Sequence, residues 1–529
     1  MNPHKSQAEK QFTVKKPFGM ATLMLVLVLA VASLLPAGEN ENPSFAIRSF
    51  SIEGNTVLQK ESLMEAVQAF TGEKKTAEDV EGARDALERL FHESGYPTVL
   101  VNIPEQTVDT GIVKLQVIES RIKRVRVAGN KYFTMEHIRA NLPALKPGEI
   151  LFLPQIRTEL SQINRNPDLK VSPVLIPGRE LGTIDVELKV DDKLPLHGSL
   201  ELNNRSTHTT TDTRLNASLR YDNLWQKGHS ISAQFQTSPE KTSEVLVFSG
   251  SYSLPAPWDR NHLLIGYVVA SDSETASGEG FNVIGKGTMA GLRYMIPLPP
   301  QGRYDHNLTL GLDWKDFEED SQGSVTPIEY MPLMFGYAST LAGETGVTQF
   351  SADLNLLFRN VLMNDMDEFQ NKRYGATGNY IYLTAGVERR QELPRGFSLF
   401  AKVDGQIADQ PLVNNEQYSA GGVTSVRGYK ESELLADNAL HGTLEVFSPS
   451  LVKQLPLMPY VFYDWAWLSV RDPLPGEWDS VFIHGLGLGV QGTWKDKIDF
   501  KLDWGLALED TDDTEVHDQE WYFKLNYRF

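Results

Sequence analysis

From about His197 to Phe529 the chain repeatedly alternates hydrophobic and polar residues, as half-buried β-strands do. The alternation is sharpest at the end: every odd position from Trp521 to Phe529 is large and apolar, whereas Lys524, Asn526 and Arg528 lie between them. Other clear strands are Leu215–Tyr221, Ser230–Gln236, Val245–Leu254, Leu263–Val269 and Leu308–Trp314. When such segments are marked through to Phe529, the pattern predicts about 16 strands. Each strand together with its connection is long enough for a membrane-spanning barrel strand and a turn or loop.

The first part of the chain mixes short strands with amphipathic helices. The segment Phe50–Asn55 recurs 75 residues later as Val125–Asn130, and each copy ends on Gly-Asn, a pair that suits a tight turn. The first copy predicts a strand at 50–53, helices over 63–70 and 77–94, and strands over 98–103 and 112–118. The second predicts a strand at 122–127, helices at 134–141 and 154–164, and strands at 171–176 and 183–190. Each copy is therefore expected to form an α+β unit, a helix pair packed on a three-stranded sheet.

The N-terminus has the pattern of a secretory signal peptide. Four lysines precede an apolar run from Met20 to Leu35, which ends in small residues, so we expect residues 1–37 to be removed. An uncleaved anchor is the alternative. Removal takes away four Lys and one Glu, and the formal charge of −19 becomes −19 − 4 + 1 = −22. An acidic mature chain argues against nucleic-acid binding.

The amino-acid composition narrows the class of protein further. All nine Trp lie at or after Trp225, as expected if they form the interfacial girdles of a membrane barrel, although a sugar-binding β-domain is also rich in Trp. No run of 18 apolar residues follows residue 38, so an integral membrane protein with this sequence must be a barrel. The absence of Cys excludes zinc–cysteine clusters, thiol nucleophiles and a lipidated cysteine.

Motifs in the two repeats resemble a known family. The segment Gly95–Val99, continuing through Ile103–Gln106 to Val117–Glu119, is similar to the first POTRA domain of TpsB two-partner secretion transporters (the ShlB/FhaC/HecB haemolysin secretion/activation family). Asn164–Pro167, followed by Pro177-Gly178, resembles the end of their second POTRA domain. The resemblance implies POTRA 1 at 45–120, POTRA 2 at 121–192 and a transmembrane β-barrel at 193–529.

A loop motif extends the resemblance to the wider BamA/TpsB outer-membrane superfamily. The segment Gly421–Tyr429, with the core Val426, Arg427, Gly428 and Tyr429, is followed by Asp437 and resembles a loop that folds back into the barrel. We place this inward-folded loop at 410–438. In the superfamily its Arg meets an acidic residue of a Phe-x-Asp-x-Gly motif. The match here runs from Phe462 through Asp464 to Ala466, where Ala replaces Gly, and it pairs Arg427 with Asp464. The terminal Phe529 resembles the C-terminal signal read by the barrel assembly machinery.

The resemblance implies a Gram-negative outer-membrane protein whose periplasmic POTRA domains capture an unfolded, TpsA-like exoprotein that is exported through the barrel (type V secretion). Outer-membrane lipid is its other expected partner. A BamA- or TamA-like insertase of other barrels is the main alternative, and a passive porin or adhesin is a third. No G-x-S-x-G, H-E-x-x-H or P-loop motif is present, and we expect no enzyme activity, cofactor or metal site. Acidic groups such as Glu318–Asp320 are expected to tip solvated loops.

The N-terminal segment departs from the family pattern. Family members often begin with a helix that plugs the pore, followed by a linker. Only about seven residues, Gly38 to Ser44, separate the expected cleavage site from the first POTRA strand. We therefore expect either that the plug helix is absent or that cleavage lies earlier, and that closure of the pore depends more on the inward-folded loop.

Overall fold

The computed structural model describes residues 44–273, 275–278, 281–284, 286–321, 324–359, 366–452 and 456–529. The expected signal peptide and the place of a plug helix lie outside these residues. The described chain forms two compact units. The first comprises 44–128, Asn141–Arg165 and Val171–Val190, and the second comprises Gly129–Ala140, Asn166–Lys170 and Asp191–Phe529. No described helix is long and apolar enough to cross a membrane.

The first repeat has the predicted β-α-α-β-β order with one addition. Its elements are β1 (Phe45–Ile47), β2 (Ser49–Glu53), α2 (Lys60–Gln68), β3 (Gly72–Lys75), α3 (Ala77–Glu93), β4 (Val99–Asn102) and β5 (Ile112–Glu119). The three-stranded sheet has the order β2-β5-β4, in which β2 is parallel and β4 antiparallel to β5. Leu63, Leu87 and Phe91 of the helices are buried in one apolar core with Leu115 of β5. The pair β1–β3 was not predicted.

The second repeat builds a similar sheet from β6 (Arg121–Ala128), β8 (Thr183–Asp192) and β7 (Leu169–Pro177), in the order β6-β8-β7. Its helices are α4 (Met135–Ala140) and α5 (Leu153–Ile163). Both repeated Gly-Asn pairs form turns, in which Gly54 and Gly129 have φ of 90° and 97°. The side-chain amide of Asn55 donates to the carbonyl of Leu58, and that of Asn130 donates to the carbonyl of Phe133. This shared turn explains why Gly-Asn recurs.

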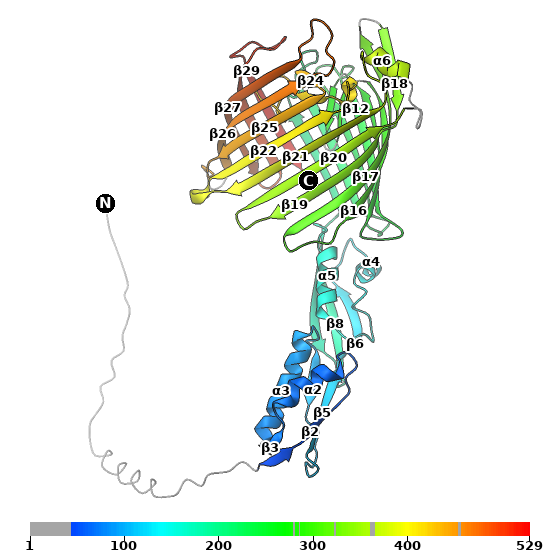
Figure 1. The fold of residues 1–529 in the computed structure, drawn as a ribbon, viewed down its shortest axis with the longest axis vertical. Helices are drawn as coiled ribbons and strands as arrows, with labels where there is room; N and C mark the ends of the chain where they lie inside the picture. The colour runs from blue at the N-terminus through cyan, green and yellow to red at the C-terminus, as the bar shows by residue number, and fades with distance from the viewer. Residues whose placement is uncertain are drawn as a thin grey trace, which may run out of the picture. The chain divides into compact units, whose positions relative to one another are not determined.

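The rest of the chain is a closed antiparallel β-barrel of 16 strands, which confirms the predicted fold (Figure 1). Counted from the N-terminal side, the barrel strands are β9 (Leu196–Asn203), β10 (Arg214–Leu224), β11 (His229–Thr237), β12 (Leu246–Pro255), β13 (Leu263–Asp272), β16 (Lys286–Pro297), β17 (Tyr304–Ser321), β19 (Leu333–Ala342), β20 (Gly346–Leu357), β21 (Tyr380–Glu392), β22 (Ser398–Ala408), β25 (Asn438–Phe447), β26 (Leu457–Ser469), β27 (Ser480–Trp494), β28 (Ile498–Ala507) and β29 (Gln519–Arg528). We call the end at which β9 begins the proximal end and the opposite end the distal end.

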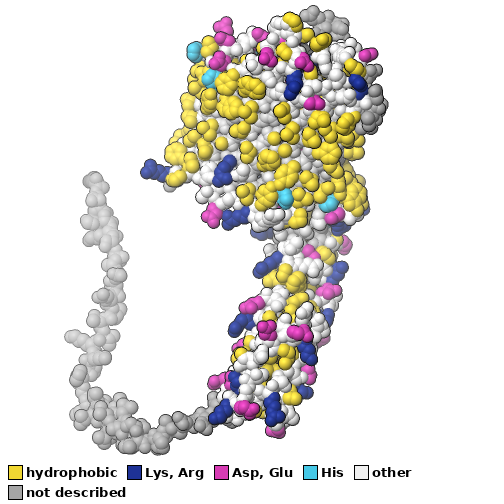
Figure 2. Space-filling view, in the orientation of Figure 1, with side chains coloured by type: hydrophobic (Ala, Val, Ile, Leu, Met, Phe, Trp, Pro, Cys, Tyr) yellow, Lys and Arg dark blue, Asp and Glu magenta, His cyan; other side chains and the backbone are white. Residues whose placement is uncertain are grey.

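Alternating exposure identifies the two faces of the barrel wall. Along β26, Val461, Tyr463 and Trp467 are exposed, whereas Phe462 and Asp464 between them are buried. Hydrophobic side chains cover much of the outside of the barrel on the face shown in Figure 2. Such a surface is unfavourable in water and suits the hydrocarbon core of a bilayer. The buried face of each strand therefore points into the lumen.

The distal end carries structure that the alternation does not predict. Strand β17 runs on beyond the barrel wall and pairs with β18 (Ser324–Tyr330), and β14 (Thr275–Gly278) pairs with β15 (Phe281–Ile284). The acidic residues Glu318–Asp320 lie within β17, so their placement in a loop was wrong. They were misplaced because the predicted strand stopped at Trp314, whereas hydrogen bonding to β18 continues it to Ser321.

Candidate functional site

The connection between β22 and β25, residues 409–437, is folded against the buried face of the barrel wall. It contains the short helix η3 (Asn414–Glu416) and a small hairpin of β23 (Tyr418–Ala420) and β24 (Leu434–Ala436). The loop residues in its apolar core, Val426 among them, pack with wall residues of β25 to β28; the cluster comprises Ala420, Val426, Tyr429, Ala436, Ala439, Ala466, Leu468, Ile483 and Ala507. The loop therefore occupies part of the lumen.

Arg427 at the tip of this loop is paired with Asp464 of β26. Its Nε lies 2.6 Å from Oδ2 and its Nη2 lies 2.9 Å from Oδ1, so the guanidinium donates to both carboxylate oxygens. The backbone N–H of Arg427 also donates to Oδ2 over 3.2 Å. The arginine side chain is 2% exposed and that of Asp464 is 0% exposed. A planar fork on a carboxylate is the strongest common ion-pair geometry in proteins.

Two further carboxylates surround the same guanidinium. Nη1 of Arg427 lies 2.7 Å from Oε1 of Glu445 on β25 and 3.5 Å from Oδ2 of Asp503 on β28. Lys501 lies 3.2 Å from Asp503, and the hydroxyl of Tyr460 donates to the same carboxylate. The cluster thus holds three carboxylates and two cations, so the charge of Arg427 is needed to keep the carboxylates together.

The ring of Phe462 completes the pocket. The guanidinium carbon of Arg427 is 3.5 Å from the centre of this ring, which is close enough for a strong cation–π contact. Ala466 stands where the family motif has Gly. It is fully buried against the loop in the apolar cluster, so its methyl group is accommodated.

Gly428 lets the backbone of the loop tip touch the wall. Its φ is 115°, and a Cβ added to it would lie 2.7 Å from the backbone nitrogen of Ala507. On the wall side, a Cβ added to Gly505 would lie 2.7 Å from the nitrogen of Gly428, and one on Gly485 would overlap the carbonyl of Arg427. Glycine on both sides therefore permits the contact.

Two tyrosines fix the tip by hydrogen bonds. The hydroxyl of Tyr429 lies 2.9 Å from the carbonyl oxygen of Glu509 and 3.2 Å from that of His484, and it accepts from the N–H of Glu509. The hydroxyl of Tyr522 on β29 accepts from the N–H of Gly428 over 2.9 Å and donates to the carbonyl of Tyr429 over 2.6 Å. Tyr522 thereby satisfies two backbone groups of the loop.

Six residues of this site, Val426 to Tyr429 with Phe462 and Asp464, were predicted from the sequence, and they lie together in the structure. Glu445, Asp503 and Tyr522 were missed. Each lies on the buried face of a barrel strand, so alternation marks them as lumen-facing, but only the register between strands reveals that they reach Arg427.

Phe529 lies away from this site, where the barrel closes. The backbone N–H of Phe529 donates to the carbonyl of Gly198 over 3.0 Å, and the N–H of Gly198 donates to the carbonyl of Phe529 over 3.1 Å. Strands β29 and β9 share five residue pairs, Lys524–Arg528 with Ser199–Asn203. The last residue therefore adds one reciprocal pair of backbone hydrogen bonds to the junction of β29 and β9, and it is 54% exposed.

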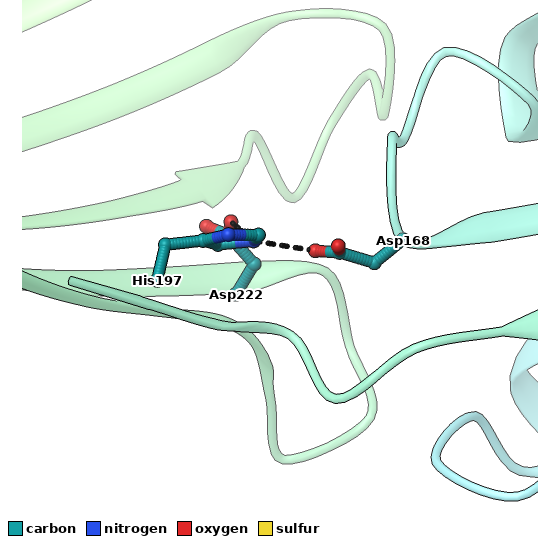
Figure 3. Close-up of side chains that lie close together, drawn as sticks. All are labelled: Asp168, His197 and Asp222. Atoms are coloured by element: carbon teal, nitrogen blue, oxygen red, sulfur yellow. Dashed lines mark hydrogen bonds and ion pairs between the residues drawn. The ribbon is translucent and has the colours of Figure 1, made fainter. Parts of the chain in front are cut away.

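One histidine and two aspartates meet near the proximal end (Figure 3). Nε2 of His197 on β9 lies 2.7 Å from Asp168 and 3.6 Å from Asp222 of β10. These side chains contact one another, and Asp222 also accepts from Nε of Arg220 over 3.1 Å. The cluster ties the turn at 166–170 to the first two barrel strands.

The chain is similar in sequence to known outer-membrane secretion proteins. Residues 182–492 match the family model described as haemolysin secretion/activation protein ShlB/FhaC/HecB, and residues 45–120 match the POTRA domain of ShlB type. The heme/hemopexin transporter protein HuxB of Haemophilus influenzae is 20% identical over 471 residues, which cover 82% of this chain and 78% of HuxB. The outer membrane transporter CdiB of Dickeya dadantii is 26% identical over 218 residues, 40% of this chain and 38% of that protein.

Solved structures share the fold. CdiB from Escherichia coli superposes with a TM-score of 0.66 at 20% identity, covering 94% of this chain and 93% of CdiB. BamA from Haemophilus ducreyi lacking POTRA domains 1–3 superposes with a TM-score of 0.55 at 14% identity, covering 92% of this chain and all of that one. Both likenesses concern the fold alone.

Proposed function

The chain belongs to the haemolysin secretion/activation family ShlB/FhaC/HecB, and on that premise we propose that it captures one unfolded exoprotein and exports it through the barrel. It is an outer-membrane transporter of the TpsB type, with a role in two-partner secretion. The exported partner would be a TpsA-like protein, met by the POTRA domains in the periplasm.

The contact between Arg427 and Asp464 carries the proposal. The loop is folded into the lumen and fastened there by a buried ion pair, two tyrosines and a glycine contact, an arrangement that can hold a pore closed. A transporter needs such an arrangement if its pore must stay closed when no client is being exported. Because the lumen admits water, the separated charges can be solvated once the loop leaves, so the lock is reversible.

The POTRA sheets offer strand edges for capture. In POTRA 2 the described strands leave the outer edge of β7 without a further strand, and Leu175 and Ile176 near its end are 42% and 44% exposed. An extended apolar segment of the client can add to such an edge by backbone hydrogen bonds. We therefore propose β7 as the capture edge. The periplasm holds no ATP, and folding of the client outside the cell would drive its passage.

We propose two other partners. The apolar outer face of the barrel fits outer-membrane lipid, and the C-terminal Phe529 fits recognition by the barrel assembly machinery. The insertase alternative receives support only at the level of the fold, through BamA.

Deletion of the gene tests the proposal against the insertase. We expect the culture supernatant, compared by mass spectrometry, to lose one large protein or very few, while the abundance of other outer-membrane barrels stays unchanged. Re-expression of the wild type should restore that protein. A general loss of barrels from the membrane would instead establish the insertase, and an unchanged supernatant would contradict the export role.

A further inference from the structure

The folded-in loop is fastened to the barrel at its base as well as at its tip. We define the base as residues 410–417 together with Asp437, and the tip hairpin as residues 418–436. Glu416 at the base has a side chain that is 1% exposed. Its carboxylate receives Nζ of Lys315 over 2.5 Å and the hydroxyls of Tyr330 and Tyr382 over 2.6 and 2.7 Å. These donors come from β17, β18 and β21.

The other end of the loop has its own buried carboxylate. Asp437 is fully buried, and the guanidinium of Arg373 donates to both of its oxygens over 2.6 and 2.7 Å. The backbone N–H groups of Leu412 and Arg471 donate to the same carboxylate over 2.9 and 2.7 Å. Arg373 also donates to the carbonyl of Leu412, so one arginine holds both limbs of the base.

An apolar cluster surrounds the base. Leu412 and Val413 are 0% and 1% exposed and pack with Phe369 of α6 (Met366–Lys372) and with Tyr330 and Tyr380. Burial of these two aliphatic side chains stabilises the base because it removes apolar surface from water. The base is therefore held by two ion pairs and by hydrophobic packing.

The tip and the base are fastened to different parts of the barrel wall. Lys315, which holds the base, lies on the seventh strand where that strand begins to pair with β18, and Asp503, which faces the tip, lies on the fifteenth strand. Strands eight apart in a closed barrel of 16 lie on opposite sides. The chemistry of the two attachments also differs, because Glu416 and Asp437 of the base accept from Lys315 and Arg373, whereas Arg427 of the tip donates to carboxylates of the wall. The loop thus spans the lumen.

Connectivity decides which end can move. Gln410 is two residues from the end of β22 and Asp437 directly precedes β25, so the base cannot travel far. Arg427 is ten residues from Asp437. Within the tip hairpin, Tyr418 pairs with Ala436, and the hydroxyls of Ser419 and Ser432 lie 2.9 Å apart. These bonds let the hairpin move as one arm.

We propose that the pore opens by a swing of the tip hairpin about a fixed base, and that Lys315 and Arg373 are positioning residues that hold this base in place. The inference rests on the proposed export function. It deepens that function by naming which part of the loop moves and which part stays bound during export.

Two engineered cysteine pairs test the inference, because the chain has no Cys of its own. The base pair is Thr377→Cys with Gln410→Cys, whose side-chain oxygens lie 2.6 Å apart. The tip pair is Glu433→Cys with Thr514→Cys, whose oxygens lie 2.7 Å apart. Each is expressed in the deletion strain, bridged with a disulfide-containing bis-maleimide, and checked for bridging by mass spectrometry. The readout is the supernatant level of the protein that the deletion removes.

We expect the bridged base pair to export at least half of the wild-type amount. The bridged tip pair should export at least tenfold less and recover when dithiothreitol cleaves the bridge. The four single-cysteine variants, treated alike, control for the substitutions, and heat-shifted migration on gels controls for folding. A block by the base bridge as strong as that by the tip bridge would overturn the fixed base while leaving the export function intact. Undiminished export with both bridges formed would overturn the gating role of the loop and the inference with it.

Discussion

The guanidinium of Arg427 lies over the ring of Phe462, 3.5 Å from its centre, while two of its nitrogens donate to Asp464. Arg427 comes from the loop, whereas Phe462 and Asp464 lie two residues apart on the same face of β26. One strand therefore supplies both a carboxylate and an aromatic face to a single loop side chain. Lysine cannot satisfy both at once, because it lacks the planar fork.

Gly428→Ala should release the loop tip although it changes no charge. The new Cβ would lie 2.7 Å from the nitrogen of Ala507, in a backbone conformation with φ of 115° that alanine rarely adopts. We expect export to fall at least fivefold. Gly476→Ala is the matched control, because Gly476 has φ of 103° but no atom within 4 Å of an added Cβ. Equal export by both variants would show that the close contact at Gly428 is unimportant.

Tyr522→Phe should weaken the lock without moving the backbone. Loss of the hydroxyl leaves the buried N–H of Gly428 and the carbonyl of Tyr429 without this partner, at a cost of about 1–3 kcal/mol. Proteolysis of purified protein within residues 418–436 should accelerate by at least about fivefold, the factor that corresponds to 1 kcal/mol. Tyr527→Phe, on the exposed face of the same strand, should leave the cleavage rate unchanged. A rate unaffected by Tyr522→Phe would exclude its role in the lock.

Arg373→Gln and Asp437→Asn should be energetically coupled. Each removes one partner of a buried pair, so each should lower the urea midpoint of unfolding. The free energy of unfolding of the double variant should fall by less than the sum of the two single decreases. A coupling free energy on the order of 1–3 kcal/mol is expected for directly paired residues. Additive losses would mean that Arg373 does not hold Asp437 in solution.

Removal of Phe529 should reduce the amount of assembled barrel. The residue supplies one reciprocal backbone pair to a seam of only five other residue pairs. We expect at least threefold less heat-modifiable protein in the outer membrane, whereas Phe529→Tyr should assemble normally. Equal assembly of the shortened chain would show that neither the pair nor the aromatic end is needed.

Much of the fold can be predicted from the sequence because barrel walls impose strict alternation. Trp521 to Phe529 show this directly, with apolar residues at odd positions and an outward, exposed face. The Arg427–Asp464 pairing was expected from resemblance to a family motif. Alternation alone predicts only whether a side chain faces the lumen or the lipid. It does not predict the position of the residue along the barrel axis.

The remaining contacts depend on register and on irregular segments. Glu445 and Asp503 are brought to Arg427 by the stagger of β25, β26 and β28, which no local pattern encodes. Arg373 follows α6 in a connection without periodic hydrophobic spacing, so nothing in its surroundings predicts that it meets Asp437, 64 residues later. The strand extension from Trp314 to Ser321 was missed for a related reason, since its partner β18 lies outside the barrel wall.

The steady ionic current of purified protein in a planar lipid bilayer tests most directly whether Arg427 holds the loop in a closed pore. Arg427→Ala leaves Asp464, Glu445 and Asp503 without their shared cation, and breaking such a buried cluster costs about 3–5 kcal/mol. We predict a small current for the wild type, the same small current for the exposed-arginine control Arg389→Ala, and a current at least fivefold larger for Arg427→Ala. Equal currents through the wild type and Arg427→Ala would contradict it.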